Sequence, residues 1–421
     1  MSNDIPHNFK QNTDFLYLSG LNQANSILLC ETTTGAEVNS ILFIRRQPDY
    51  LLQYEGEKLK SENVADIYGV SECYYLDEFG EQVEKRYVNP TKEGENRKLI
   101  FHLGSTSPNN FMSFSQHINP FITTLKTSKN SSKIEIKNLD SHIEKFRLIK
   151  SQNEQTLIIS AAEISANAIN LTRSQVETGN LENESQVLAA LNFAAANMAG
   201  PGVVVRNSYP PVVSSGKNTT VLHYDENDRN FGNQHLLVDF GVCQYHYNSD
   251  VTRCFSSSSG NPNLAALHQA YTSLHKIQTT LIDAIKLAFN KEKSGKKDKL
   301  SLSDLNKLYH ILLVKELVSL GFSKKAENLI QIVSKICPHN ICHHIGLDVH
   351  DCKNVDQDLQ LRTGMCFALE PGMYFREGLE GVPERFRNLG LRIEDVIVIG
   401  DDGEVIVASE GCEKDPEVVF G

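Results

Sequence analysis

The chain has 421 residues, of which 40% are hydrophobic and 22% charged, and its formal net charge is −11. This length exceeds one typical domain, and the apolar content can build sizeable cores, so we expect two domains. The acidic balance argues against a nucleic-acid-binding protein, and the sequence has no run of about 20 apolar residues that could span a membrane.

Cysteine usage indicates the redox compartment. Nine cysteines are scattered from Cys30 to Cys412 without a paired spacing, which fits free thiols in a reducing compartment better than a disulfide framework. Residues 1–5 resemble neither a signal peptide nor an Arg-rich transit peptide. We therefore expect the cytoplasm if the chain is complete.

The first third of the sequence has the pattern of a small mixed domain. Short apolar runs at residues 26–30 and 39–44 predict strands, and residues 63–68 and 111–125 are predicted to be helical. The polar residues 126–133 are typical of a linker. We predict an N-terminal domain over residues 1–140 and a C-terminal domain over residues 141–421, and the fold class is α/β in the broad sense that includes α+β.

The remaining two thirds contain helices followed by strands. Apolar residues recur at helical spacing from residue 146 to 169, and residues 184–198 predict a second helix. β-Branched and aromatic residues then predict strands at residues 236–242, 365–369 and 391–399. The basic residues 291–299 are interpreted as a solvated loop that joins two helices.

Five polar residues suggest a site for two metal ions: Asp239, Asp250, His343, Glu370 and Glu394. Asp239, Glu370 and Glu394 lie inside or beside these apolar runs. A carboxylate within such a run is costly to bury unpaired, and coordination to a cation removes that cost. Oxygen donors with one nitrogen and no thiolate favour manganese, cobalt, iron or zinc. Two dications with a bridging hydroxide between them would perform metal-assisted hydrolysis.

The histidines are unevenly distributed along the chain. Four of the 14 lie between residues 339 and 350. His343 and His344 compete for the role of metal ligand, and spacing alone does not choose between them. Pro371 directly follows Glu370 and biases it to an extended conformation, so that Glu370 would project from a strand end.

The order Asp, Asp, His, Glu, Glu with these flanks resembles the metallopeptidase family of methionine aminopeptidases, prolidases and Xaa-Pro aminopeptidases (aminopeptidase P). Residues 209–224 and 338–351 resemble the proline-specific branch, and residues 2–20 resemble the start of its N-terminal domain. Methionine aminopeptidases lack this form of the histidine-rich segment. Residues 336–339, 384–387 and 389–395 are most similar to the mitochondrial type of Xaa-Pro aminopeptidase.

This resemblance implies a C-terminal domain with the pita-bread fold, in which a curved antiparallel sheet surrounds the metals. It implies that Asp239 binds one metal, that Asp250 and Glu394 bridge both, and that His343, favoured over His344, completes the other site with Glu370. Glu370 would also act as general base. The residues implied beside the substrate are His223, His350, His339, Arg392 and Tyr374, of which His223, His350 and Arg392 are expected to take part in catalysis together with Glu370.

The resemblance also implies an activity and its partners. We expect removal of the N-terminal residue from peptides with Pro in second position, two divalent ions (Mn²⁺, with Co²⁺ or Zn²⁺ as alternatives), a homodimer and a mitochondrial location. Prolidase activity on Xaa-Pro dipeptides and single-residue trimming after presequence cleavage are alternatives, and a non-catalytic binding protein is another.

The sequence departs from the family pattern beside Asp250. The usual Thr-Arg-Thr becomes Thr252-Arg253-Cys254. A thiol is a weaker hydrogen-bond donor than a hydroxyl, so we expect weaker hydrogen-bond support for Asp250.

Overall fold

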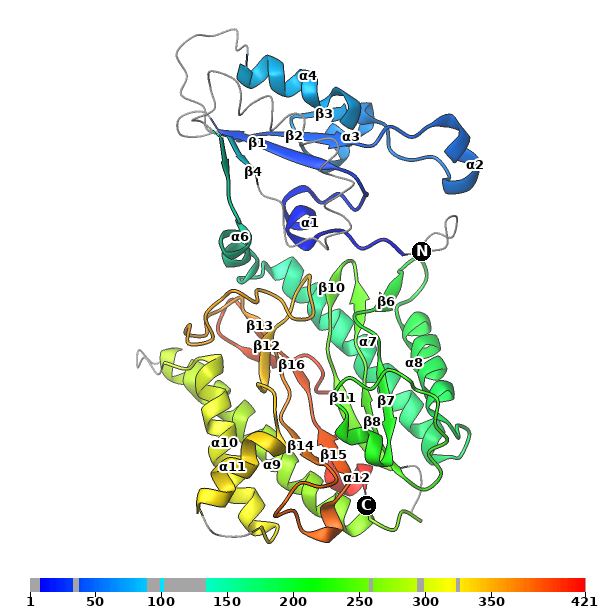
Figure 1. Cartoon of the computed structure of the whole chain (residues 1–421), viewed down its shortest axis with the longest axis vertical. Coiled ribbons are helices and arrows are strands. Elements are labelled where there is room, and N and C mark those ends of the chain that lie inside the picture. Colours follow the sequence, from blue (N-terminus) through cyan, green and yellow to red (C-terminus); the bar gives the residue numbers. More distant parts are fainter. Residues whose placement is uncertain are drawn as a thin grey trace. The chain divides into compact units, whose positions relative to one another are not determined.

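The computed structural model of the chain describes residues 8–32, 38–88, 99–101, 134–256, 260–293, 299–322 and 326–420. The chain forms two compact units, Met1–Ile143 and Glu144–Gly421, and each contains helices and strands (Figure 1). The predicted mixed fold class is thus confirmed. The boundary predicted after residue 140 falls at the start of a helix, Asp140–Arg147, and remains a prediction.

The first unit is built on a three-stranded sheet with β2 at its centre. The central strand pairs antiparallel with β1 and parallel with β3. Its side chains alternate between two small cores, Ile41 and Phe43 in one and Leu42 and Ile44 in the other, as expected for a strand covered on both faces. The strands are β1 (Ile27–Thr32), β2 (Val38–Ile44) and β3 (Glu72–Tyr75).

Short helices and a second strand pair accompany the three-stranded sheet in the first unit. The predicted helix at 63–68 lies within α3, whereas the predicted helix at 111–125 and the linker at 126–133 lie outside the described residues. The helices are α1 (Thr13–Ser19), α2 (Leu52–Glu55), α3 (Ser61–Tyr68) and α4 (Phe79–Val83), and a parallel pair consists of β4 (Leu99–Phe101) and β5 (Ile134–Ile136).

The long helices belong to the second unit. Three of them begin at capping boxes, in which Ser151, Asn183 and Ser301 accept a hydrogen bond from the backbone three residues on. None of the helices within the described ranges is long and apolar enough to cross a bilayer. Helix α6 (Asp140–Arg147) begins in the first unit and ends in the second. The helices of the second unit are α7 (Gln152–Glu177), α8 (Glu184–Met198), α9 (Leu264–Lys293), α10 (Leu302–Ser319), α11 (Ala326–Ile336) and α12 (Pro416–Val419).

The helix prediction for residues 146–169 is only partly right. The pattern crosses a break between α6 and α7, because Ser151 caps a new helix at Gln152. The backbone N–H of Lys150 at this break donates to Gly364 O at 2.7 Å, which ties the connection to a distant loop. The second predicted helix, 184–198, coincides with α8.

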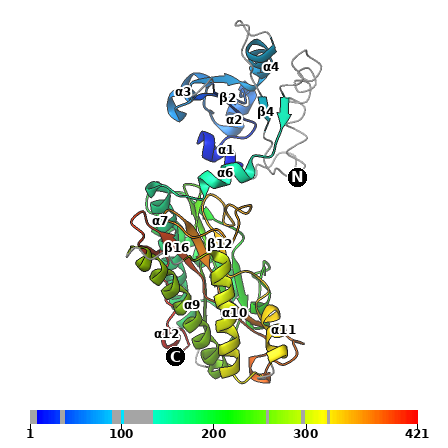
Figure 2. The same ribbon diagram turned by 90° about the vertical axis from the view of Figure 1, so that its left-hand side faces the viewer.

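The strands of the second unit lie between α7 and α8 on one side and α9, α10 and α11 on the other (Figures 1 and 2). Hydrogen bonding groups them into the orders β10-β9-β6, β11-β8-β7, β12-β13-β16-β17 and β14-β15. Their bounds are β6 (Val205–Asn207), β7 (Val212–Ser215), β8 (His235–Asp239), β9 (Val242–Gln244), β10 (Tyr247–Asn248), β11 (Thr252–Ser256), β12 (Cys342–His344), β13 (Cys366–Leu369), β14 (Gly372–Phe375), β15 (Leu389–Arg392), β16 (Asp395–Ile399) and β17 (Val405–Val407).

Two of the predicted strands are interrupted. The 236–242 run breaks after Asp239, where the backbone of Ser249 passes so closely that a Cβ on Gly241 would lie 2.0 Å from Ser249 O. The 391–399 run breaks at residues 393–394, and its two halves belong to different sheets. Glu394 N donates instead to Thr252 O at 3.1 Å. Both breaks occur beside polar residues of the predicted metal site.

Close backbone packing also constrains Gly390. A Cβ on this residue would lie 2.0 Å from Thr219 O, and Gly390 N donates to Thr219 Oγ1 at 2.9 Å. We expect Gly390→Ala to destabilise the protein by about 1–3 kcal/mol, because the two segments would have to separate. Denaturant unfolding measures this effect, and Gly411→Ala is the matched control because nothing lies within 4 Å of its added Cβ. Equal stability of the two variants would contradict the prediction.

Candidate metal centre

The first half of the site lies at the end of β8. Thr252 of β11 pairs with Asp239, and Asp250 lies two residues before β11. The Tyr209 hydroxyl is 2.5 Å from Asp239 Oδ1 and 2.6 Å from Asp250 Oδ1. A phenol has a single hydrogen to donate. The carboxylates of Asp239 and Asp250 therefore share the one hydroxyl proton of Tyr209, and the two short contacts hold the carboxylates close together.

The second half of the site comes from β12, β13 and β16. His343 in β12 pairs with Ala368 of β13. Glu370 directly follows β13, and its N–H donates to Ile341 O at 2.8 Å, while Glu394 directly precedes β16. The strand pairing therefore positions one imidazole and two carboxylates at neighbouring strand ends.

The side chains of both halves converge. His343 Nε2 lies 3.5 Å from Asp250 Oδ2, 3.7 Å from Glu370 Oε1 and 3.7 Å from Glu394 Oε1. Three groups have ligand atoms within 4.8 Å of one another: Asp239 with Asp250 and Glu394, His343 with Glu370 and Glu394, and Asp250 with His343 and His350. The structure thus brings all five predicted ligands into one cluster.

The His343 ring directs its Nε2 toward the carboxylates of the cluster. Its Nδ1 lies 3.1 Å from Val349 O and 3.2 Å from His344 O. Carbonyl oxygens only accept, so Nδ1 carries the proton and the lone pair of a neutral ring is on Nε2, facing the carboxylates. His344 is 3% exposed and belongs to none of the three groups, so the structure places His343 rather than His344 in the cluster.

The electrostatics of the cluster fit divalent cations. Burial and then repulsion from Glu394 hold the pKa of Asp250 and of Glu370 well above the ordinary range. Glu394 Oε1 is buried without a hydrogen-bond partner among the described residues, although such atoms are nearly always satisfied. A carboxylate-rich set with one imidazole suits manganese, cobalt, iron or zinc, and a cation would relieve both the repulsion and the unsatisfied oxygen.

Arg392 links the two halves of the cluster. Its guanidinium contacts Asp239 Oδ2 at 2.5 Å and donates to Thr252 Oγ1 and the Tyr374 hydroxyl, each at 2.9 Å. Thr252 in turn donates to Glu394 Oε2 at 2.7 Å. The buried arginine therefore fixes the orientation of one carboxylate directly and of another through a threonine.

The other predicted histidines lie around this cluster at different depths. His339 Nε2 is 3.1 Å from the Tyr374 hydroxyl, and His339 Nδ1 is 3.7 Å from Glu370 Oε2. The exposed His350 packs its ring edge-to-face on His343, with centroids 4.3 Å apart. His223 is exposed and follows the 3₁₀ turn Gly216–Thr220. The pKa of His350 is lowered first by burial, then by the charge of His343, and also by the charge of His223.

Sequence reasoning missed Tyr209 and the hydrogen bonds around Arg253. The sequence gives no sign that Tyr209 turns into the cluster. The Arg253 guanidinium donates to Glu394 O at 2.6 Å and to Asp395 Oδ1 at 2.7 Å, which a sequence cannot reveal. From the sequence we expect Cys254 to weaken the hydrogen-bond support for Asp250. The Cys254 thiol instead donates to Arg392 O at 3.5 Å, so this contact does not bear on Asp250.

Comparison with known proteins assigns the family. Residues 156–401 match the model of metallopeptidase family M24. The chain belongs to this family. Residues 1–93 match the N-terminal domain of aminopeptidase P, so family models cover most of both units. This M24 metallopeptidase therefore has the family and the two-part organisation that its motifs resemble.

Several curated proteins are similar to this M24 metallopeptidase over most of its length. Xaa-Pro aminopeptidase 3 of Homo sapiens is 29% identical over 421 residues, which cover 99% of this chain and 77% of the relative. Intermediate cleaving peptidase 55 of Saccharomyces cerevisiae is 29% identical over 399 residues, 94% of this chain and 73% of the relative. The prediction of a metallopeptidase is confirmed by the family.

Solved structures agree with the fold. Aminopeptidase P from E. coli in its low-pH form superimposes with a TM-score of 0.83 at 23% identity, covering 100% of this chain and 90% of that one. Icp55 from Saccharomyces cerevisiae gives a TM-score of 0.77 at 24% identity, with 98% and 89% covered. Because the sequence identity is below 25%, this similarity concerns the fold alone. The fold is that of the M24 family, and the predicted fold is confirmed.

Proposed function

We propose that this metallopeptidase is a dinuclear metal-dependent Xaa-Pro aminopeptidase that releases the N-terminal residue of peptides with proline second. The observation that carries the proposal is the convergence of Asp239, Asp250, His343, Glu370 and Glu394 in one partly buried cluster. Support for the substrate class comes from the similarity to Xaa-Pro aminopeptidase 3 over nearly the whole chain.

The cluster can hold two cations side by side. We assign Asp239 to one ion, Asp250 and Glu394 to both, and His343 and Glu370 to the other. Glu394 belongs both to the group with Asp239 and to the group with His343, which supports a shared ligand. Bound divalent ions would activate a water molecule and polarise the scissile carbonyl. Manganese is our first choice among the ions that suit this donor set, with cobalt and zinc as alternatives.

The chain's own residues then supply proton transfer and positioning. Glu370 accepts the proton of the attacking water as general base. His350 and His223 hydrogen-bond the substrate or the tetrahedral intermediate near the scissile bond. The contact of His339 with the Tyr374 hydroxyl, and of that hydroxyl with Arg392, supports placing these three residues in the wall of the substrate pocket.

Hydrolysis of three matched peptides in the presence of Mn²⁺ tests the substrate. They are an Xaa-Pro-Yaa tripeptide, an Xaa-Pro dipeptide and a longer peptide beginning Tyr-Ser or Leu-Ser. Cleavage of the tripeptide between Xaa and Pro is the expected result. Cleavage of the dipeptide alone would replace the proposal by a prolidase.

A second candidate is removal of one residue from proteins whose presequence has been cleaved. It is favoured by similarity to intermediate cleaving peptidase 55, and preference for the Tyr-Ser or Leu-Ser peptide would establish it. No cleavage of any of the three peptides, with metal bound, would indicate a non-catalytic binding protein.

Metal removal is expected to lower thermal stability as well as activity. A ligand present at 1,000 times its Kd stabilises the native state by about 4 kcal/mol, and here it would also cancel repulsion among buried carboxylates. We expect a lower Tm after treatment with a chelator and its recovery on adding Mn²⁺, measured by scanning calorimetry. A Tm independent of metal in the wild-type protein would contradict metal binding at this cluster.

We also propose a homodimer. The first unit exposes large apolar side chains, including Tyr50, Tyr54 and Ile67, which are 69%, 82% and 59% exposed. An interface between subunits would remove these side chains from water, which is favourable. Sedimentation at assay concentration tests the proposal, and a monomer at every concentration would reject it.

For location, we propose the mitochondrion. The similarity to the Arabidopsis thaliana protein named intermediate cleaving peptidase 55, mitochondrial, supports it. Fractionation of cells that express the tagged protein tests it, and recovery in the cytosolic fraction alone would favour the cytoplasm.

A further inference from the structure

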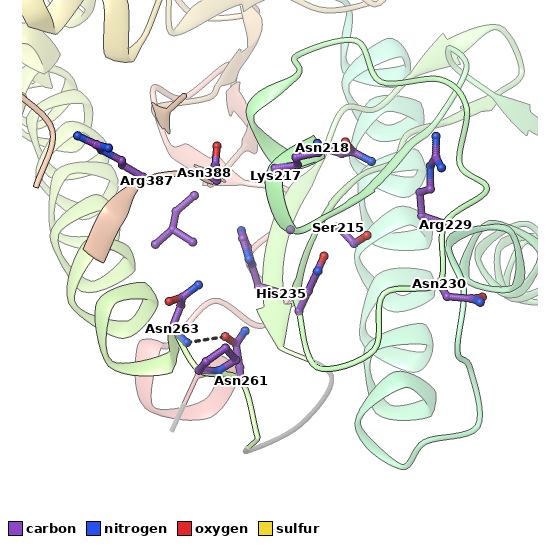
Figure 3. A pocket seen from close by; sticks show the side chains of 14 residues that line it. Ser215, Lys217, Asn218, Arg229, Asn230, His235, Asn261, Asn263, Arg387 and Asn388 are labelled. Carbon is purple, nitrogen blue, oxygen red and sulfur yellow. Dashed lines mark hydrogen bonds between the residues drawn. The ribbon is translucent and has the colours of Figure 1, made fainter. Parts of the chain in front are cut away.

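A polar pocket lies in the second unit (Figure 3). It contains His235, at the opposite end of β8 from Asp239. It has a volume of about 610 Å³, and His235, the first residue of β8, forms part of its wall. Four residue steps of a strand separate His235 from Asp239, which is about 13 Å. None of the five predicted metal ligands lines the pocket, so the pocket is separate from the metal cluster.

The lining of this pocket is cationic in an acidic protein. Lys217, Arg229 and Arg387 contribute three positive charges, whereas the whole chain carries −11. The 14 lining residues, all of them described, include six carboxamides and no carboxylate. Figure 3 shows Lys217 and Arg229 on the β7–β8 side of the pocket and Arg387 across from them. A pocket of this kind attracts anions.

The three cations are available to a ligand. Arg387 pairs with Glu384 at 2.9 Å, and Arg229 pairs with Asp228 at 3.2 Å and with Glu226 at 3.6 Å. All of these side chains are between 48% and 82% exposed. Exposed ion pairs of this kind contribute little, so an anion can compete for the guanidinium groups. Lys217 is exposed and has no ion pair within the described part of the chain.

A buried carboxamide adds an unsatisfied donor to the wall. Asn261 is only 8% exposed, and its Oδ1 accepts a hydrogen bond from Asn263 N at 2.9 Å. Its Nδ2 has no hydrogen-bond partner among the described residues. An unsatisfied buried donor is unfavourable, and an oxygen-rich ligand would satisfy it.

Hydrogen bonds hold the deep wall of the pocket in place. His235 Nε2 lies 3.1 Å from Thr219 Oγ1 and 3.3 Å from Gly390 O, and Gly390 N donates to Thr219 at 2.9 Å. These contacts join segments that are distant in the sequence. A wall fixed in advance lowers the entropic cost of ligand binding.

We propose that this pocket binds a small phosphorylated polyol of the size of a sugar phosphate. The cations suit a phosphate group, and the carboxamides offer both donors and acceptors to several hydroxyl groups. Apart from the buried His235, the lining has no aromatic ring on which a nucleotide base could stack. The volume lies within the range of about 300–1,000 Å³ that is typical of small-molecule sites.

Calorimetric titration of the metal-loaded protein with glucose 6-phosphate, and separately with glucose, tests this proposal. We expect saturable binding of glucose 6-phosphate and weaker binding of glucose. The double variant Lys217→Glu/Arg387→Glu should bind glucose 6-phosphate at least about tenfold more weakly, because two cations that can donate charge-assisted hydrogen bonds to the phosphate are removed. Both residues are exposed, so folding is retained, and peptide hydrolysis should be unchanged.

Lys315→Glu is the matched control, because Lys315 is exposed on α10 outside the pocket. It should bind glucose 6-phosphate as the wild type does. Any binding of phosphate by the metals is common to all the variants and cancels in the comparison. The proposal is overturned if glucose 6-phosphate does not bind, if the double variant binds it as tightly as the wild type, or if glucose binds equally tightly. These outcomes do not depend on the peptidase substrate.

Discussion

Replacement of Asp250 by alanine is expected to reduce kcat/KM for an Xaa-Pro tripeptide by at least about 10³-fold, because metal ions supply several kcal/mol of transition-state stabilisation. Asp250 is 6% exposed, and its Oδ2 lies 3.5 Å from His343 Nε2. We assign it to both ions, so its loss should weaken both. Hydrolysis assays with saturating Mn²⁺, together with metal analysis of the dialysed protein, measure the effect.

The same variant separates loss of metal from loss of fold. Burial, followed by the charges of Glu394 and Asp239, raises the pKa of Asp250 well above its ordinary value. A group whose pKa is raised on folding destabilises the native state at pH values above its unfolded pKa. Without metal, Asp250→Ala should therefore melt at or above the Tm of the wild type near pH 7.

A control for the Asp250 experiment is Asp283→Ala on the exposed face of α9, which should keep full activity and the metal-dependent rise in Tm. Full activity of Asp250→Ala would reject the two-ion mechanism. A variant of Asp250 that unfolds without metal, when the wild type does not, would reject the account of repulsion among the buried carboxylates.

Part of the cluster could be predicted from sequence because three of its members follow a local rule. Asp239, Glu370 and Glu394 border apolar runs, and isolated carboxylates in such places need a partner. The choice of His343 over His344 required the family resemblance, since adjacent residues on a strand point to opposite faces and spacing does not say which face is which. The structure supplies the missing observation, namely the two carbonyl oxygens that accept from Nδ1 of His343.

What could not be predicted depends on contacts between distant segments. Residues 391–399 have the composition of one strand, yet β15 and β16 belong to different sheets because Glu394 N bonds to Thr252 O, 142 residues away. Tyr209 likewise reaches Asp239 across 30 residues. Periodicity within a short window of residues carries no information about such distant partners. The sequence therefore predicts that strands occur in these regions, but not where they break or which side chains support the cluster.

Arg253 shows how such a distant contact supports the cluster. It is 1% exposed and donates to the backbone oxygens of Thr252 and Glu394 at 2.9 and 2.6 Å and to Asp395 Oδ1 at 2.7 Å. Asp395 also accepts from Lys414 Nζ at 2.6 Å and from Gln278 Nε2 at 2.9 Å. The guanidinium therefore holds the strand start that carries Glu394.

Arg253→Met is expected to lower the free energy of unfolding by about 3–5 kcal/mol, because removing one member of a buried pair leaves the other charge undercompensated. Burial acts to raise the pKa of Asp395, but the charges of Arg253 and then Lys414 outweigh it and lower that pKa overall. A lowered pKa contributes stability that is present above the unfolded pKa of about 3.9 and is lost as pH falls. The difference in stability between wild type and variant should therefore shrink on acidification from pH 7 to pH 3.

Denaturant unfolding at several pH values measures both the size and the pH dependence of the Arg253 effect, and exposed Arg362→Met is the control. Below its melting transition the Arg253 variant should show a lower kcat with little change in KM, since a misplaced Glu394 disturbs the reacting centre more than the substrate's distant contacts. A stability loss that is the same at pH 7 and pH 3 would show that Asp395 is not the partner that matters. In that case the backbone contacts of the guanidinium, rather than its charge, would fix the start of β16.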